Sequence, residues 1–162
     1  MRTIFLGFSM LILFLIDQTL LPFVAVYESY GSLLFTFMGL FIMQTDYDDA
    51  FVVGLLSGLL QDLYFPYVFG LHTLLNVLLF TGLSRIGLTL KEGKKTVPVL
   101  SLTLAQGIKT AVIIAVLYVF GIGSNYMPLL IMPLYTLLLS MLFYKRSVAY
   151  SRIPIVKKEW RF

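Results

Sequence analysis

The sequence predicts an all-α membrane protein: a polytopic chain with six transmembrane helices. Of its 162 residues, 59% are hydrophobic and only 12% are charged, whereas a soluble domain needs more polar surface. Apolar runs of about 20 residues, the length that crosses a bilayer, recur along the chain. The sequence has no Cys and a single His, which excludes disulfides and Cys-based metal sites. The net charge of +4 does not indicate nucleic acid, because the basic residues gather on one side of the predicted spans.

The predicted helices follow the apolar runs in chain order. They cover residues 3–26, 31–43, 50–64, 69–90, 97–120 and 126–144. The second and third are short for a bilayer of roughly 30 Å and could instead form one re-entrant hairpin. Such a hairpin would carry Asp46, Asp48 and Asp49 towards the membrane middle without a basic partner in the same segment, so the cost of burying charge favours two spans. We therefore predict one six-helix domain over residues 1–144 and a basic cytoplasmic tail over residues 145–162.

The basic residues predict the orientation in the membrane. They precede the first span or follow the fourth and sixth, and all fall on one side: Arg2, Arg85, Lys91, Lys94, Lys95, Lys145, Arg146, Arg152, Lys157, Lys158 and Arg161. The opposite loops, residues 27–30, 65–68 and 121–125, contain no Lys or Arg. By the positive-inside rule, both termini are then cytoplasmic. Asp17 and Gln18 interrupt the first apolar run, so we expect a retained helix rather than a signal peptide.

A set of polar residues lies deep inside the predicted spans. It consists of Asp17, Gln61, Asp62, His72, Asn76, Gln106 and Lys109. At about 1.5 Å per residue, the two Asp and the Lys lie roughly 18–20 Å from the cytoplasmic starts of their spans, and Asn76 reaches a similar depth from the other side. Charges in hydrocarbon pair with one another or face water. We therefore predict that Lys109 bonds Asp62 or Asp17, with the amides satisfying the remaining lone pairs.

The sequence leaves three roles open for this set. It could lock the helices together, which is the favoured reading, line a ligand or lipid cavity, or form a proton or ion path. For His72 alone, packing near the outer end of its span is favoured over catalysis. Gly54 and Gly58, four residues apart, let a neighbouring backbone approach closely, and packing within the chain is favoured over dimerisation.

The same region carries a resemblance to a known family. Gly54-Leu55-Leu56-Ser57-Gly58-Leu59-Leu60-Gln61-Asp62-Leu63, followed by Phe69-Gly70-Leu71-His72-Thr73-Leu74-Leu75, resembles the signature of the rod shape-determining protein MreD family. That signature is a Gly-rich helix with an acidic end, a short loop, a Gly-Leu step and a fourth span. Chain length, six-span layout and a basic C-terminal tail are also similar.

The resemblance implies a non-catalytic subunit of the bacterial cell-elongation machinery in the cytoplasmic membrane. Its expected partners are the single-span protein MreC and, more widely, the actin-like MreB, a RodA-type polymerase and a transpeptidase. It implies a fold similar to the substrate-binding subunits of energy-coupling-factor transporters, and no enzymatic activity or cofactor. The residues agree on the last point, because the loops contain no nucleophile–base pair, phosphate loop or metal-spacing motif.

The loop between the third and fourth predicted spans is a candidate docking surface. It contains Tyr64, Phe65, Tyr67 and Phe69 where polar residues are usual, and an exposed apolar patch marks a contact with protein or lipid. We expect it to bind MreC, although interfacial anchoring by tyrosines explains it equally well. The alternative function is a solute- or lipid-binding subunit of a transporter. The first span lacks the four-residue stripe of Ala that such subunits typically use to dock their partner.

Overall fold

The computed structural model describes residues 2–89, 95–123, 125–154 and 156. These residues form six α-helices and one short 3-10 helix, without a β-strand among them. The elements are α1 (Arg2–Thr19), η1 (Leu21–Val24), α2 (Leu33–Ile42), α3 (Tyr47–Asp62), α4 (Leu71–Thr89), α5 (Thr96–Val119) and α6 (Pro128–Ser151). The prediction of an all-α fold is confirmed. Four helices, α1, α4, α5 and α6, are long and apolar enough to cross a membrane, which indicates a membrane protein.

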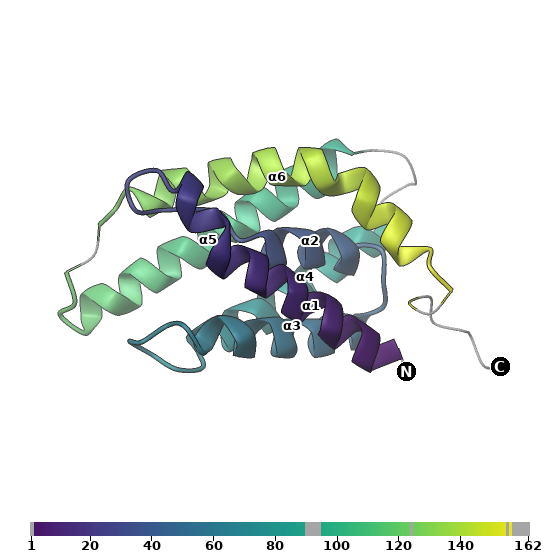
Figure 1. Cartoon of the computed structure of the whole chain (residues 1–162), viewed down its shortest axis with the longest axis horizontal. Coiled ribbons are helices and arrows are strands. Elements are labelled where there is room, and N and C mark those ends of the chain that lie inside the picture. The colour runs from purple at the N-terminus through teal and green to yellow at the C-terminus, as the bar shows by residue number, and fades with distance from the viewer. Residues whose placement is uncertain (1, 90–94, 124, 155, 157–162) are drawn as a thin grey trace.

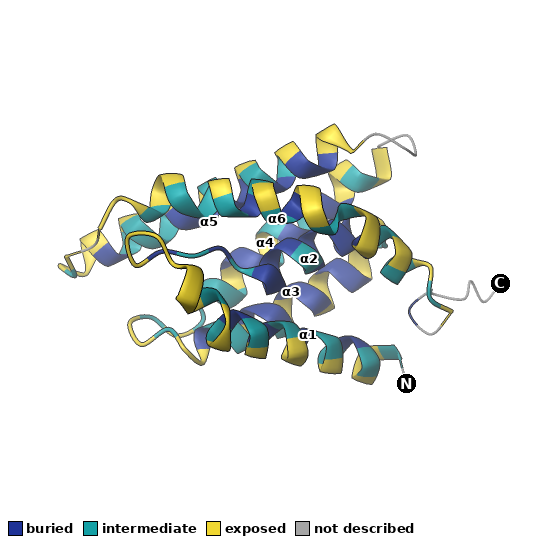
Figure 2. Cartoon of the chain, turned by 45° about the horizontal axis from the view of Figure 1, so that its top comes forward, coloured by how far each residue is buried: buried dark blue, intermediate teal, exposed yellow. Residues whose placement is uncertain are grey.

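The other two helices are shorter, and α2 lies inside the bundle. At 10 residues, α2 is about 15 Å long, and every one of its residues except Phe37 is buried. It lies in the middle of the helices in Figure 1, and in Figure 2 its ribbon is largely dark blue. A helix that is apolar all round is stable where protein surrounds it, so a short helix is tolerated at this place. That α2 and α3 also cross the bilayer remains a prediction.

Successive helices run in opposite directions (Figure 1). The loops that follow α1, α3 and α5 lie at one end of the bundle, at left in the figure, and we call this the loop end. The start of α1, the turn between α2 and α3 and the last turn of α6 lie at the other end, which we call the terminal end. Because Arg2 and Val156 share a hydrogen bond there, the two ends of the described chain are close together.

The hairpin of α3 and α4 is packed backbone to backbone. A Cβ atom added to Gly58 would lie 2.3 Å from Thr73 Cα, and one added to Gly54 would lie 2.8 Å from Val77 Cα. Only glycine permits this approach. The predicted small-residue pair therefore packs inside the chain, against α4.

The outer faces of the bundle are apolar. In Figure 2, yellow residues recur along the outward sides of α1, α5 and α6. They include Ile4, Phe8, Ile12, Leu15, Leu100, Leu104, Ile108, Leu130, Leu134, Leu138 and Leu142. Helix α6 continues past the predicted boundary at residue 144 to Ser151, so the first part of the expected tail is helical. Lys91, Lys94, Lys157, Lys158 and Arg161 lie outside the described residues.

Candidate functional site: a buried polar cluster

Asp62 caps the N-terminus of α4. Its carboxylate accepts hydrogen bonds from the backbone N–H of His72 at 2.9 Å and of Thr73 at 3.0 Å, and from the Thr73 hydroxyl at 2.5 Å. The first N–H groups of a helix have no partner within it and need an external acceptor. The residue preceding α4 is Gly70, whose φ of +92° favours glycine and which has no side chain to act as a cap. The acceptor therefore comes from the end of α3.

Asp17 binds the N-terminus of α2 in a similar way. Its carboxylate accepts from the backbone N–H of Leu33 at 2.7 Å and of Leu34 at 3.0 Å, and from the Ser32 hydroxyl at 2.7 Å. Ser32 is itself the N-cap residue and accepts from the Phe35 N–H at 3.0 Å. Side chains thus accept from each of the first three N–H groups of α2.

Lys109 reaches the same region from α5 and binds neutral groups. Its Nζ donates to Gln61 Oε1 at 2.6 Å and to Asn76 Oδ1 at 2.7 Å. The ammonium also lies 4.4 Å from the centroid of the Phe35 ring, within the range of a cation–π contact. Only 3% of the residue is exposed, so its charge is compensated by protein groups.

The predicted direct bond from Lys109 to Asp62 or Asp17 is wrong. No salt bridge or hydrogen bond joins these side chains within the described chain, because both carboxylates are occupied by helix N-termini. Each helix N-terminus carries about half a positive charge. Two carboxylates, one ammonium and the starts of α2 and α4 therefore sum to a charge near zero, although the compensation is spread over backbone as well as side chains.

The side chains form one connected chain of hydrogen bonds. Gln61 Nε2 donates to Ser32 Oγ at 3.0 Å, and Gln61 Oε1 accepts from Asn76 Nδ2 at 3.1 Å. Asn76 Nδ2 also donates to Ser57 Oγ at 3.1 Å. Through Ser32, the chain extends to Asp17. Helices α1, α3, α4 and α5 and the start of α2 are thereby connected by polar contacts in the interior.

Three residues of the predicted set lie outside this chain, and one of them is Asp62, whose described hydrogen bonds all go to the start of α4. Gln106 Nε2 donates to Thr110 Oγ1 of the same helix at 3.2 Å and contacts Met132 Sδ of α6 at 3.8 Å. The ring of His72 packs edge-on against Phe65, with centroids 4.8 Å apart, and its Nδ1 has no hydrogen-bond partner among the described residues. Only the backbone N–H of His72 takes part in the cap.

The cluster is chemically closed. Lys109 has three N–H donors, and two oxygens and an aromatic face surround it. Each of the two carboxylates accepts three hydrogen bonds, which uses most of its four lone-pair sites. An arrangement in which protein groups fill most hydrogen-bonding positions favours a role in holding the helices together.

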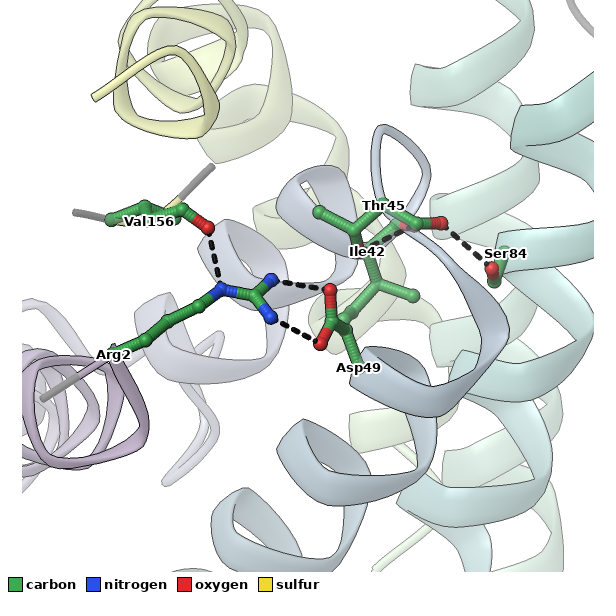
Figure 3. Close-up of polar contacts among 6 residues, drawn as sticks. All are labelled: Arg2, Ile42, Thr45, Asp49, Ser84 and Val156. Carbon is green, nitrogen blue, oxygen red and sulfur yellow. Dashed lines mark hydrogen bonds and ion pairs between the residues drawn. The ribbon is translucent and has the colours of Figure 1, made fainter. Parts of the chain in front are cut away.

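A second polar contact joins the helices at the terminal end (Figure 3). Arg2 donates through Nη1 and Nη2 to both carboxylate oxygens of Asp49, at 2.9 and 2.5 Å, and through Nε to the Val156 carbonyl at 2.6 Å. Ser84 donates to the Thr45 carbonyl at 3.0 Å. The bidentate pair of Arg2 and Asp49 compensates the charge of one of the three Asp residues between the second and third predicted spans. Its basic partner comes from another segment of the chain.

The aromatic loop at the loop end is exposed. Tyr64, Tyr67 and Phe69 are between 56% and 69% exposed. Phe65 is half-buried and packs edge-on against Tyr67, with centroids 5.5 Å apart. The two neighbouring loops also expose large apolar side chains, which are Phe23, Tyr27, Tyr118, Phe120 and Tyr126. The loop is therefore one of three exposed aromatic segments at this end.

Several site residues were missed from the sequence. Ser32 directly precedes an apolar run, the usual place of an N-cap, so a signal for it was present. Thr73, Ser57 and Phe35 had no such signal, because their roles depend on which helices are neighbours. Arg2 and Asp49 were both predicted on the cytoplasmic side, but the sequence does not show that they meet.

Comparisons with family models, with curated proteins and with solved structures give no match for this chain. In the part of the chain that the structure describes, no group of three or more His, Cys, Asp or Glu residues could hold a metal ion. The argument for function therefore depends on the geometry and on the resemblance of the α3–α4 region.

Proposed function

We propose that this protein is a non-catalytic, multi-pass subunit of the bacterial cell-elongation machinery, similar to MreD proteins, that binds an MreC-like partner and helps organise peptidoglycan synthesis and cell shape. In this proposal the protein lies in the cytoplasmic membrane with both termini in the cytoplasm. Helices α2 and α3 are then two of its six transmembrane spans. The basic residues Arg2, Arg85, Lys95 and Arg146 favour this orientation. The wider complex would contain MreB, a RodA-type polymerase and a transpeptidase.

One observation carries the proposal. The residues that resemble the family signature are the ones that build the α3–α4 hairpin: Gly54 and Gly58 bring the backbones together, and Asp62 binds the start of α4 beyond Gly70. Signature residues that act together in one hairpin support a relationship to the family better than the same number of matches dispersed along the chain. The hairpin places the aromatic loop of residues 64–69 at its tip, and this loop is our candidate contact for the MreC-like protein.

The closed polar cluster supports a structural rather than a catalytic role. Lys109, Asp17 and Asp62 have most of their hydrogen-bonding positions filled by protein groups. A proton carrier or solute site needs a polar atom that is free to exchange its partner. The transporter alternative therefore has no supporting site within this cluster.

The test is co-purification from native membranes. The tagged protein, expressed at native level, should recover the MreC-like protein of the same cell, identified by mass spectrometry. Replacing Tyr64, Phe65 and Tyr67 together with Ser should reduce this recovery strongly. The matched control replaces Tyr118, Phe120 and Tyr126, which are exposed aromatic residues at the same end, and should leave recovery close to that of the wild type.

The two variants separate docking from membrane anchoring. If both triple variants lower recovery and membrane content alike, the aromatic residues act only as interfacial anchors. If the wild-type protein recovers no MreC-like protein at all, the proposed function itself is wrong. Retained vitamin or another solute in the purified protein would favour the transporter alternative.

A further inference from the structure

A groove of about 240 Å³ lies between α5 and α6 near the terminal end. It is lined by Lys95, Thr96, Val99, Leu100, Met141 and Tyr144. None of these residues belongs to the buried polar cluster or to the aromatic loop. The groove is smaller than the roughly 300–1,000 Å³ of sites that enclose a whole drug-sized ligand, so it fits one part of a molecule whose remainder lies along the protein surface.

The lining changes from polar to apolar along the helices. Lys95 and Thr96 stand at the start of α5, and Leu100 lies one turn further in, about 6 Å along the axis. Helix α6 runs the other way, so Tyr144 lies nearer the terminal end than Met141, by about 4.5 Å. A polar rim and an apolar interior therefore follow one another in the direction from the membrane surface to its middle.

An exposed apolar path continues from the interior of the groove. On α5, Leu104 and Ile108 extend the line of Leu100, and on α6, Leu138 and Leu134 extend the line of Met141. All of these side chains are exposed. A hydrocarbon chain that leaves the groove thus meets apolar surface on both helices.

The polar rim favours a negative charge. Lys95 is exposed and supplies an ammonium group, and the Thr96 and Tyr144 hydroxyls add further donors. Helix α5 has no side-chain cap at its N-terminus, so its dipole adds to the attraction. Among the residues that the structure describes, no Asp or Glu lines the groove.

We propose that this groove binds an anionic phospholipid. The phosphate lies at Lys95 and Thr96, and one acyl chain follows Leu100 and Met141 towards the middle of the bundle surface. The combination of a cationic rim and a continuous apolar path fits a lipid better than a soluble anion, which would gain nothing from the apolar part. The proposal is independent of the partner proposed above.

The test is native mass spectrometry of the full-length protein taken from nanodiscs that contain phosphatidylglycerol and phosphatidylcholine in equal amounts. The wild-type protein should retain phosphatidylglycerol preferentially. Lys95→Gln should lower that preference about five-fold, the effect of one basic residue near an anionic headgroup. Because Lys95 is exposed and precedes the helix, the variant should keep its helix content, which circular dichroism checks.

The matched control is Lys145→Gln. It removes the same charge from an exposed position next to Tyr144 but outside the lining, and should change the preference little. An equal loss in both variants would mean a general attraction to surface charge and would overturn the proposal. So would equal retention of the two lipids by the wild-type protein, or an unchanged preference in Lys95→Gln.

Discussion

Asp17 and Asp62 bind helix N-termini with the same chemistry and are both buried, at 4% and 2% exposed, but the residues whose N–H groups they accept differ in exposure. Each lies near the end of one helix and accepts two backbone N–H groups and one hydroxyl from the start of the next. Around Asp17, the N–H of Leu34 belongs to a fully buried residue. Around Asp62, His72 and Thr73 are half-buried at the edge of the loop end. We therefore expect the burial of the N–H donors, rather than the number of hydrogen bonds, to decide how much each cap contributes to stability.

The helix pairs joined by these two residues, α1–α2 and α3–α4, also differ in how closely they pack. Gly54 and Gly58 bring α3 into backbone contact with α4, whereas a Cβ added to Gly7 of α1 would meet nothing within 4 Å. The start of α4 is therefore held by backbone packing and by Asp62 together. The start of α2 depends on Asp17 and Ser32. Each prediction below changes one of these differences.

The largest effect is expected for Asp17→Ala. It leaves the N–H groups of Leu33 and Leu34 unpaired in the interior, and at about 2 kcal/mol for each stranded donor the free energy of unfolding should fall by about 4 kcal/mol. Titration with SDS in mixed micelles, followed by circular dichroism, measures this loss. Asp17→Asn keeps one acceptor oxygen and should lose about half as much. A loss smaller than that of Asp62→Ala would contradict the role assigned to burial.

Gly58→Ala should have the next largest effect. The new Cβ would lie 2.3 Å from Thr73 Cα, so α4 must move away and the free energy of unfolding should fall by about 3 kcal/mol, the upper range for overpacking. The control is Gly82→Ala on α4, where nothing lies within 4 Å and no loss is expected. If both variants unfold at the same SDS fraction, close backbone packing does not stabilise this hairpin.

Asp62→Ala is expected to lower the free energy of unfolding by less than either Asp17→Ala or Gly58→Ala. The two N–H groups belong to half-buried residues, His72 and Thr73, so we expect water to replace part of the lost cap and the loss to be about 2 kcal/mol, the upper range for an N-cap. Hydrogen exchange of His72 and Thr73 should rise locally in this variant. Unchanged exchange there would mean that Asp62 does not hold the start of α4 in solution.

The fold was predictable because the length and spacing of apolar runs determine where helices can lie in a membrane. The predicted ranges agree with the observed helices to within a few residues at most ends. The clearest misses are α1, which ends at Thr19 although its span was predicted to continue to residue 26, and α6, which continues to Ser151. Lys145 and Arg146 mark where the membrane was expected to end, but both are good helix formers, and a helix need not stop at the membrane surface.

The sequence allowed us to predict the depth of the buried polar residues but not their hydrogen-bond partners. Counting residues from the span ends brought Asp17, Asp62, Asn76 and Lys109 to one level, and hydrogen bonds through Ser32 and Gln61 connect Asp17, Asn76 and Lys109, whereas Asp62 bonds the start of α4. The depth of a residue in the membrane does not determine the direction in which its side chain points from the helix axis. The partner of Lys109 could therefore not be derived from the sequence. The backbone N–H groups of α2 and α4 were also not considered, although the free N–H groups at the start of a helix readily donate to a nearby buried carboxylate.

Lys109→Met should have the smallest effect and tests the remaining electrostatic link between the caps. Gln61 Oε1 would still accept from Asn76 Nδ2, so only one acceptor, Asn76 Oδ1, loses its donor. The region loses one positive charge, but the desolvation cost of the ammonium is also removed, and both carboxylates keep the N–H groups of α2 and α4. The expected change is about 1 kcal/mol or less. Combined with Asp62→Ala, it should recover less than about 1 kcal/mol, because the two side chains share no hydrogen bond. Recovery of most of the Asp62→Ala loss in the double variant would mean that a direct ion pair forms in the membrane and that the helix N-terminus is the secondary partner of the carboxylate.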